Sequence, residues 1–447
     1  DASSSAIYGT QAANGVVLIT TKKGQLNQAP TITFNFKAGI NKASNQYDML
    51  NTQEYADAVW MSAKVQGNSP SHLQFGSGAS PVIPDYILPT AGKEGSASVA
   101  SALYDYEDYG IAKANKIGTN WYDEIYQNGV TQQYDLSVVG GGKNGTYSFS
   151  GGYLDEEGIL IHTKFKRYNF RMNSDAKFND WFKAGETLQA IYIDEYGNLS
   201  DNGEGTPMSQ AYRAQPIIPV YDIAGNFAGS RAKEMGNASN PVAQLYRDRN
   251  NNGKWARIIG SAYGEISFLK NFSLKSLVGY NWGQWNYKGY TIPNFEHSEP
   301  NKVNGFSQDS NYELLWNWTN TLNYSAVFND IHKINAVIGT EAIEDNYQEM
   351  GASNTVYFSE DPKYMQLSTG EGVPSINGAQ RQWSLFSQFA RVNYDLMGKY
   401  YFEASVRRDG SSRFSEANRY GVFPAASVGW LMTEENFMSG TSGWLDM

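Results

Sequence analysis

The sequence contains no cysteine. Disulfide-stapled folds, thiolate zinc sites, iron–sulfur clusters and cysteine nucleophiles are therefore excluded together. Charged residues are also scarce, at 18% of the 447 residues, against an average of about 25% in soluble domains. There are 35 Lys and Arg residues and 45 Asp and Glu residues, which gives a formal net charge of −10. Because no dense cluster of cations is present to contact phosphates, the sequence argues against nucleic-acid binding.

Long hydrophobic runs are missing as well. No stretch approaches the roughly 18 consecutive apolar residues that mark a transmembrane helix. The mean hydropathy is −0.51, although the chain contains 11 Trp, 31 Tyr and 21 Phe. A membrane β-barrel combines these properties, because lipid-facing and lumen-facing side chains alternate along each strand. Length alone would also allow about three soluble domains.

From Pro30 onward one pattern recurs along the chain. Segments of about ten residues alternate apolar and polar side chains, as the strands of a membrane barrel do. The apolar side chains are expected to contact lipid, and four of them represent this face: Phe34, Phe149, Leu274 and Val392. A soluble sandwich alternates in the same way, so alternation alone does not decide between the two.

The lengths of the connections between these segments distinguish better between a membrane barrel and a soluble sandwich. Short turns are expected at 142–145, 179–180, 270–271, 329–330 and 398–399. Long connections are expected at roughly 44–131, 155–166, 195–255, 289–310, 344–381 and 408–421. Tight turns at one end and long loops at the other are typical of an outer-membrane barrel. We therefore predict an all-β fold, a transmembrane antiparallel β-barrel with about twelve strands in this chain.

The first long connection is expected to contain two helices. Asn51 and Glu54 form a capping-box pattern that predicts a helix over 52–65. Thr119 is expected to cap a short aromatic helix that contains Trp121, Tyr122 and Tyr126. Local packing is the role we expect for both.

Aromatic residues cluster near the long-loop ends of two expected strands. One cluster is Trp282, Trp285, Tyr287 and Tyr290, and the other is Tyr312, Trp316 and Trp318. Tyr and Trp favour membrane interfaces, so both clusters are interpreted as one aromatic girdle. The alternative is a soluble core, in which Trp is also common.

Motifs for metal or nucleotide chemistry are weak. Gly140-x-Gly142-x-x-Gly145 lacks the following helix of a dinucleotide site and is interpreted as a hairpin. The residues Asp248, Asn250 and Asn252 match the first half of a calcium loop, but the bidentate Glu is replaced by Ile259. A turn-rich extracellular loop is the favoured interpretation, and the alternative is a calcium site completed by other loop carboxylates. The four His residues show no metal-ligand or catalytic spacing, so no enzyme and no cofactor are predicted.

Two charged segments leave alternatives open. The run Tyr104-Asp105-Tyr106-Glu107-Asp108-Tyr109 offers either a partner or substrate surface or a loop of self-packing rings. The residues around Gly410, namely Arg407, Arg408, Asp409 and Arg413, would bind an anionic ligand or lipid headgroup, or pair with acids in a polar lumen. The second alternative is favoured for this cluster.

Three stretches of the sequence are distinctive: DASSSAIYGTQAANGVVLITTKKG at the start, NGVTQQYDLSVVGGGKNGTYSFSGGYLDEEGILIHTKFKRYNFRMNSDAKFNDWFKAG in the middle and YYFEASVRRDGSSRFSEANRYGVFPAASVGW near the end. In these stretches the sequence resembles the SusC/RagA-type TonB-dependent outer-membrane transporters. The resemblance implies a barrel of roughly 22 strands with a plugged lumen. Residues 1–24 would then end the plug domain, and 25–447 would form the first half of the barrel. Position 1 is Asp, and both ends suggest a piece of a longer polypeptide.

The resemblance also implies a function and partners. It implies import of a nutrient across the outer membrane of a Gram-negative, Bacteroidetes-like cell, with a SusD-like surface lipoprotein as lid and with TonB contacting a segment outside this chain. Oligosaccharide is the first expected substrate and oligopeptide the second. Candidate residues that contact substrate or partner are Tyr104, Tyr106, Tyr109, Trp285, Tyr287 and Tyr290. The alternative is an adhesion or structural barrel that transports nothing, and a third is an open porin, which a plug remnant disfavours.

Overall fold

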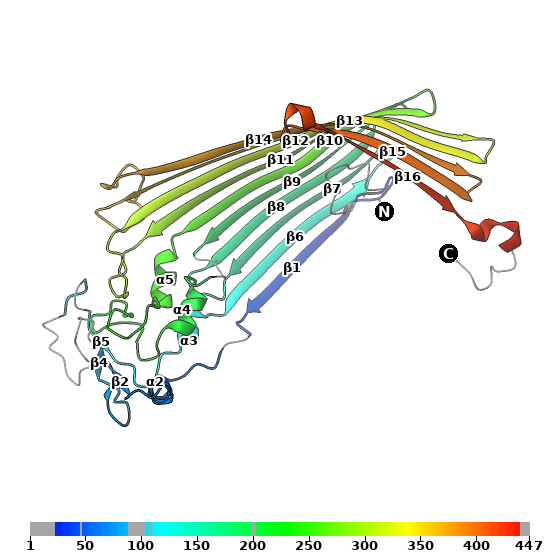
Figure 1. Ribbon diagram of the computed structural model, residues 1–447. Helices are drawn as coiled ribbons and strands as arrows, with labels where there is room; N and C mark the ends of the chain where they lie inside the picture. Colours follow the sequence, from blue (N-terminus) through cyan, green and yellow to red (C-terminus); the bar gives the residue numbers. More distant parts are fainter. Residues whose placement is uncertain (1–22, 45–46, 88–103, 108–109, 198–202, 439–447) are drawn as a thin grey trace.

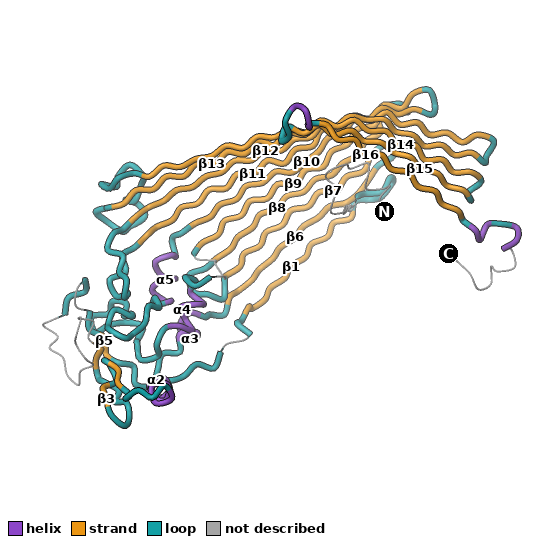
Figure 2. The backbone as a smooth tube through the Cα atoms, viewed as in Figure 1, coloured by secondary structure: helices purple, strands orange, loops and turns teal. Residues whose placement is uncertain are grey.

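The computed structural model describes residues 23–44, 47–87, 104–107, 110–197 and 203–438. The described residues form one long curved sheet with a compact unit of helices and loops at one end (Figure 1). Figure 2 shows that the helices α2 to α5 gather at this same end. No helix in the described ranges is long and apolar enough to cross a bilayer.

The sheet has twelve strands, and each neighbouring pair is antiparallel. In spatial order they are β1 (Thr31–Asn41), β6 (Gly129–Gly141), β7 (Gly145–Glu157), β8 (Lys164–Lys177), β9 (Phe182–Tyr196), β10 (Asn252–Phe268), β11 (Phe272–Thr291), β12 (Gly305–Phe328), β13 (His332–Thr355), β14 (Ser375–Leu396), β15 (Tyr400–Ser411) and β16 (Tyr420–Trp430). The predicted fold and strand number are confirmed. The predicted strand length of about ten residues is wrong for most of the strands, which are longer. The longest, β12 and β13, have 24 residues each.

The alternation of short and long connections is also confirmed. β8 and β9, for example, are joined by a tight turn, whereas β9 and β10 are separated by residues 197–251. In the turn between β12 and β13, Asn329 and Asp330 have φ angles of 50° and 60°. This left-handed conformation is one that Asn and Asp tolerate better than other non-glycine residues. The turn chemistry therefore explains why these hairpins form where the sequence predicts them.

The strand register gives the sheet an apolar face and a polar face. One cross-strand row on the apolar face is Phe34, Leu136, Gly151, Phe170, Ala190, Ile258 and Trp282. The next row on the opposite face is Asp135, Gly152, Asn169, Ile191, Arg257, Gly283, Glu313, Tyr347 and Arg381. Lys23 binds the polar face, with its Nζ 3.1 Å from Oδ2 of Asp175. The start of the described chain thus lies against the polar face, as expected for the lumen.

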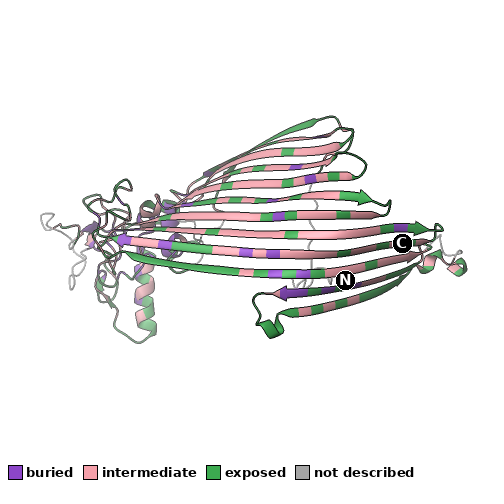
Figure 3. Cartoon of the chain, turned by 90° about the horizontal axis from the view of Figure 1, so that it is seen from above, coloured by how far each residue is buried: buried purple, intermediate pink, exposed green. Residues whose placement is uncertain are grey.

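The height of the apolar face fits a membrane. Phe182 and Tyr192 lie ten residues apart on β9, and Phe272 and Trp282 lie ten residues apart on β11. Ten residues span about 33 Å along a strand, and a tilt of about 40° reduces this to about 25 Å, the apolar height of outer-membrane barrels. The four residues chosen to represent the lipid face are all exposed, from Phe149 at 38% to Phe34 at 62%. Figure 3 shows that intermediate and exposed positions predominate along the strands.

Val278 lies near the middle of the apolar band on β11 and is 47% exposed. We expect Val278→Arg to destabilise the protein by about 2–4 kcal/mol, because an arginine near the bilayer midplane loses its hydration. The measurement is urea unfolding of the full-length protein in liposomes. Leu277→Arg is the matched control, because Leu277 projects from the polar face and its arginine stays hydrated. Equal costs for the two variants would contradict the assignment of the faces.

The unit at the long-loop end is called the cap here, and it consists of residues 47–87, 104–107, 110–128 and 203–251. Its helices are α2 (Thr52–Val65), α3 (Trp121–Ile125), α4 (Pro207–Arg213) and α5 (Pro241–Asp248), and its short strands are β2 (Ser71–His72), β3 (Gly76–Ser77), β4 (Tyr86–Ile87) and β5 (Ala112–Lys113). Single turns η3 (Glu416–Asn418), η4 (Met432–Glu434) and η5 (Asn436–Met438) lie outside it. The cap contains the main hydrophobic core of the described chain, where Trp60, Trp121 and Ile217 are buried.

The two predicted cap helices both exist. α2 has the predicted bounds and the predicted capping box between Asn51 and Glu54. The predicted cap of α3 is wrong: Asn120 caps this helix by accepting from the backbone N–H of Tyr122. The hydroxyl of Thr119 instead donates to the carbonyl of Ile218 at 2.7 Å. Thr119 therefore joins the two long connections and does not start the helix.

Candidate functional site

Strand geometry separates the aromatic residues that cluster in the sequence. Trp282 lies on the apolar face, whereas Trp285 and Tyr287, at odd spacing from it, lie on the polar face. The single girdle predicted from these residues is therefore wrong. Side chains alternate across a strand, so a run of rings close in sequence divides between lipid and lumen.

The polar face carries a wall of rings near the long-loop end. The indole rings of Trp255 and Trp285 lie 5.7 Å apart, and the rings of Trp285 and Tyr287 lie 5.7 Å apart and nearly parallel. Trp255 is 46% exposed, and its Nε1 donates to Oε1 of Glu195 at 3.3 Å. These three residues are called the ring wall below. Flat accessible rings beside carboxylates suit a ligand with both apolar faces and hydrogen-bonding groups.

Charged and aromatic side chains continue the polar face across β12 to β14. The guanidinium of Arg381 lies 4.9 Å from the ring centre of Tyr347 and 3.6 Å from a carboxylate oxygen of Asp345. The Nε1 of Trp383 donates to the same carboxylate at 2.5 Å. Sequence reasoning did not single out Trp255, Tyr347 or Trp383. Each of them is an odd number of positions from a lipid-facing residue of its own strand. That spacing would have placed the three side chains on the polar face.

Tyr290, the third strand candidate, packs away from the ring wall. Its ring lies 5.1 Å from Phe306, which belongs to a small core with Tyr357 and Met365. Its backbone N–H donates to Oδ1 of Asn251 at 2.8 Å. The structure therefore brings together Trp285 and Tyr287 but not Tyr290.

The loop candidates Tyr104 and Tyr106 lie in the cap. The Tyr104 hydroxyl donates to Oδ2 of Asp222 at 2.6 Å and accepts from Asn226 at 2.6 Å. Burial and the Asp222 carboxylate raise the pKa of Tyr104 to about 12. The ring of Tyr106 meets Phe295 edge-on at 5.2 Å. These contacts favour the self-packing alternative for both residues, and Tyr109 lies outside the described residues.

The calcium-loop residues divide between a helix and a strand. Asp248 is the last residue of α5 and accepts from Asn251 at 3.0 Å, Asn250 lies in the following turn, and Asn252 begins β10. The side chain of Asn252 donates to Asp194 at 2.7 Å. Within the described ranges, no group of three or more His, Asp or Glu residues could hold a metal ion.

The arginine cluster around Gly410 divides between the two faces. Arg407 is 4% exposed and lies on the polar face, where it donates to Asp409 at 2.6 Å, to Glu341 at 2.7 Å and to Ser387 at 2.8 Å. Arg408 lies on the apolar face with its guanidinium 3.9 Å from the ring centre of Tyr420. The favoured alternative, pairing with acids in the lumen, describes Arg407.

Comparisons with known proteins agree with this geometry, although no protein-family model matches the chain. The TonB-dependent receptor P39 of Formosa agariphila is 28% identical over 441 residues, which are 98% of this chain and 38% of that protein. The TonB-dependent receptor SusC of Bacteroides thetaiotaomicron is 26% identical over 480 residues, covering 100% of this chain and 41% of SusC. The RagAB peptide importer in its open-open state matches with a TM-score of 0.74 and 25% identity, over 98% of this chain and 48% of the matched chain.

The chain is similar in sequence and in fold to the SusC/RagA-type TonB-dependent receptors. It spans about two fifths of the length of the curated relatives named above. Its apolar face, its long loops and these similarities identify the sheet as part of an outer-membrane β-barrel. The relatives are receptors and transporters, so the prediction that the chain is not an enzyme is confirmed.

Proposed function

We propose that the complete protein actively imports a large nutrient across the outer membrane. The observation that carries this proposal is the ring wall of Trp255, Trp285 and Tyr287 on the polar face near the cap. Such rings stack on the apolar faces of sugars, and the neighbouring carboxylates and amides bind hydroxyl groups. Oligosaccharide is therefore the first substrate class. Oligopeptide is the second, and the similarity to RagAB, a peptide importer, supports it.

A SusD-like surface lipoprotein is the proposed lid. The cap exposes large apolar side chains to solvent, among them Val65 at 83% and Ile117 at 86%. Met61, one turn before Val65 on α2, is 64% exposed. Exposed apolar residues grouped on one unit are typical of a surface that binds another protein. The long-loop end, where these residues lie, is the end at which a lid from the cell surface would close.

The proposed domain division follows from the position of Lys23. Residues 1–24 would end a plug, and 25–447 would form the first half of the barrel wall. The ion pair between Lys23 and Asp175 supports this, because it joins the chain to the lumen face just before β1. TonB would contact a segment outside this chain and move the plug during import.

An uptake experiment with the full-length protein and its lid tests the proposal. Cells are given fluorescent oligosaccharides or oligopeptides, and uptake is measured with and without an uncoupler of the proton gradient. We expect uptake of one substrate class to require the protein and to stop with the uncoupler. Binding at the cell surface without uptake would favour the alternative, an adhesion barrel. Uptake that continues with the uncoupler would favour a passive porin.

A further inference from the structure

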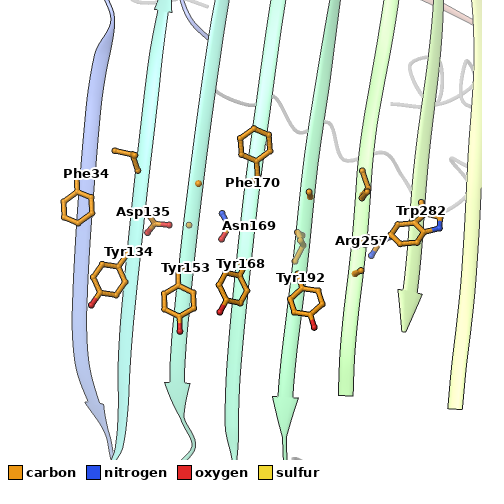
Figure 4. A pocket seen from close by; sticks show the side chains of 17 residues that line it. Phe34, Tyr134, Asp135, Tyr153, Tyr168, Asn169, Phe170, Tyr192, Arg257 and Trp282 are labelled. Carbon is orange, nitrogen blue, oxygen red and sulfur yellow. The ribbon is translucent and has the colours of Figure 1, made fainter. Parts of the chain in front are cut away.

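A row of tyrosines crosses the apolar face at its long-loop end. Tyr134, Tyr153, Tyr168 and Tyr192 are successive cross-strand neighbours on β6 to β9. Their ring centres lie 4.8 to 6.3 Å apart, and their hydroxyl groups point in the same direction (Figure 4). That direction is toward the long-loop end of the sheet, so the row marks the outer boundary of the hydrocarbon.

These four tyrosines help to line an open, shallow groove on the same face. Its volume is about 660 Å³. Small residues interrupt the face within it, at Gly151, Ala190 and Ala256, whereas Phe170 and Trp282 supply rings around them. Figure 4 shows Phe170 and Trp282 on different strands of this surface. This open apolar groove faces the bilayer, so an acyl chain can lie along it.

Two lysines lie beyond the groove on the same face. Lys254 on β10 is opposite Asn286 on β11, so Lys288 is its diagonal neighbour, with the two Cβ atoms about 7–8 Å apart. Both side chains are exposed, and neither forms an ion pair with any described residue. Asp194 on β9 is the cross-strand neighbour of Lys254 and keeps its negative charge, but its Oδ1 accepts from Asn252 at 2.7 Å and it forms no ion pair with Lys254. The two ammonium groups are therefore available to one anion.

The lysines of the neighbouring strands differ from this pair. Lys164 and Lys166 on β8 each lie 3.5 Å from the carboxylate of Asp155 on β7. That acid neutralises part of their charge. Lys254 and Lys288 thus carry positive charge on this part of the apolar face without an ion pair among the described residues.

We propose that a phosphorylated lipid of the outer leaflet binds this surface. Its phosphate lies between Lys254 and Lys288, and one acyl chain occupies the groove beside Ala256. Lys254 is two residues from Ala256 on the same strand and face, so the phosphate and acyl parts of the site are about 7 Å apart. Lys254 is four residues beyond Ile258, the neighbour of Trp282, on the long-loop side. With the strand tilt this distance is about 10 Å along the membrane normal. A phosphate so far from the level of Trp282 favours a glycolipid with a bulky headgroup.

Native mass spectrometry of the full-length protein in detergent tests the proposal. The probes are a diphosphorylated lipid A-type glycolipid, its dephosphorylated form with the same acyl chains, and inorganic phosphate. We expect the double variant Lys254→Gln/Lys288→Gln to bind the phosphorylated lipid about thirtyfold more weakly, since each lysine contributes roughly a factor of five near an anionic surface. Ala256→Phe, which places a ring in the groove next to the proposed phosphate site, should also weaken lipid binding.

The matched control is Lys143→Gln/Lys270→Gln, which removes the same charge from two exposed turns at the opposite end of the sheet. This control should bind lipid like the natural protein. Equal binding by the two double variants would overturn the proposal, as would equal binding of the phosphorylated and dephosphorylated lipids. Binding of inorganic phosphate as tight as that of the lipid would also overturn it, because the groove would then contribute nothing. None of these readouts depends on transport.

Discussion

Replacing Trp285 by alanine is expected to weaken binding of the imported substrate about thirtyfold or more. Trp285 stacks between Trp255 and Tyr287, so its loss opens the middle of the ring wall and leaves two rings apart. Truncation of a central aromatic contact costs about 2 kcal/mol or more, which corresponds to about a thirtyfold change in Kd. The measurement is titration of purified receptor with the substrate found in the uptake experiment.

Trp282→Ala supplies the matched control for this prediction. Trp282 is three residues away on the same strand and differs chiefly in facing lipid. It should leave the Kd unchanged while lowering stability modestly, because it removes a lipid-facing ring. If Trp282→Ala weakens binding as much as Trp285→Ala, the two faces are assigned wrongly or the ring wall is not the binding surface.

The barrel was predictable because its signals are local. Each strand shows its own alternation, and turns such as Asn329-Asp330 supply the backbone conformation they need without help from distant residues. The helix α2 was predictable for the same reason, since Asn51 and Glu54 are three residues apart and cap it by themselves.

The ring wall and the tyrosine row were not predictable in this way. Tyr134 and Tyr192 belong to one row but are 58 positions apart, and only the register of four strands brings them into line. A one-residue change of that register would move every ring to the opposite face. The cap core likewise combines Trp121 with Ile217 from another connection. Pairing between distant segments, which no short pattern encodes, fixes these sites.

Replacing Arg407 by alanine is expected to destabilise the protein by about 3–5 kcal/mol, the range for breaking a buried ion pair from one side. Arg407 is 4% exposed and Asp409 is 3% exposed, so the aspartate would keep its charge in a site that water hardly reaches. Glu341 and Ser387 would also lose a donor. The measurement is urea unfolding of the full-length receptor in liposomes, followed by tryptophan fluorescence.

Two further variants distinguish this explanation from a general loss of charge. Arg408→Ala removes the same side chain one position later, where the arginine is exposed on the apolar face over Tyr420, and should cost much less. Arg407→Ala/Asp409→Asn should recover part of the lost stability, because the unpaired buried charge is gone. If the double variant is no more stable than Arg407→Ala alone, the buried carboxylate of Asp409 is not the source of the cost. The arginine would then stabilise the wall mainly through its packing against Phe389, whose ring centre lies 5.6 Å from the guanidinium carbon.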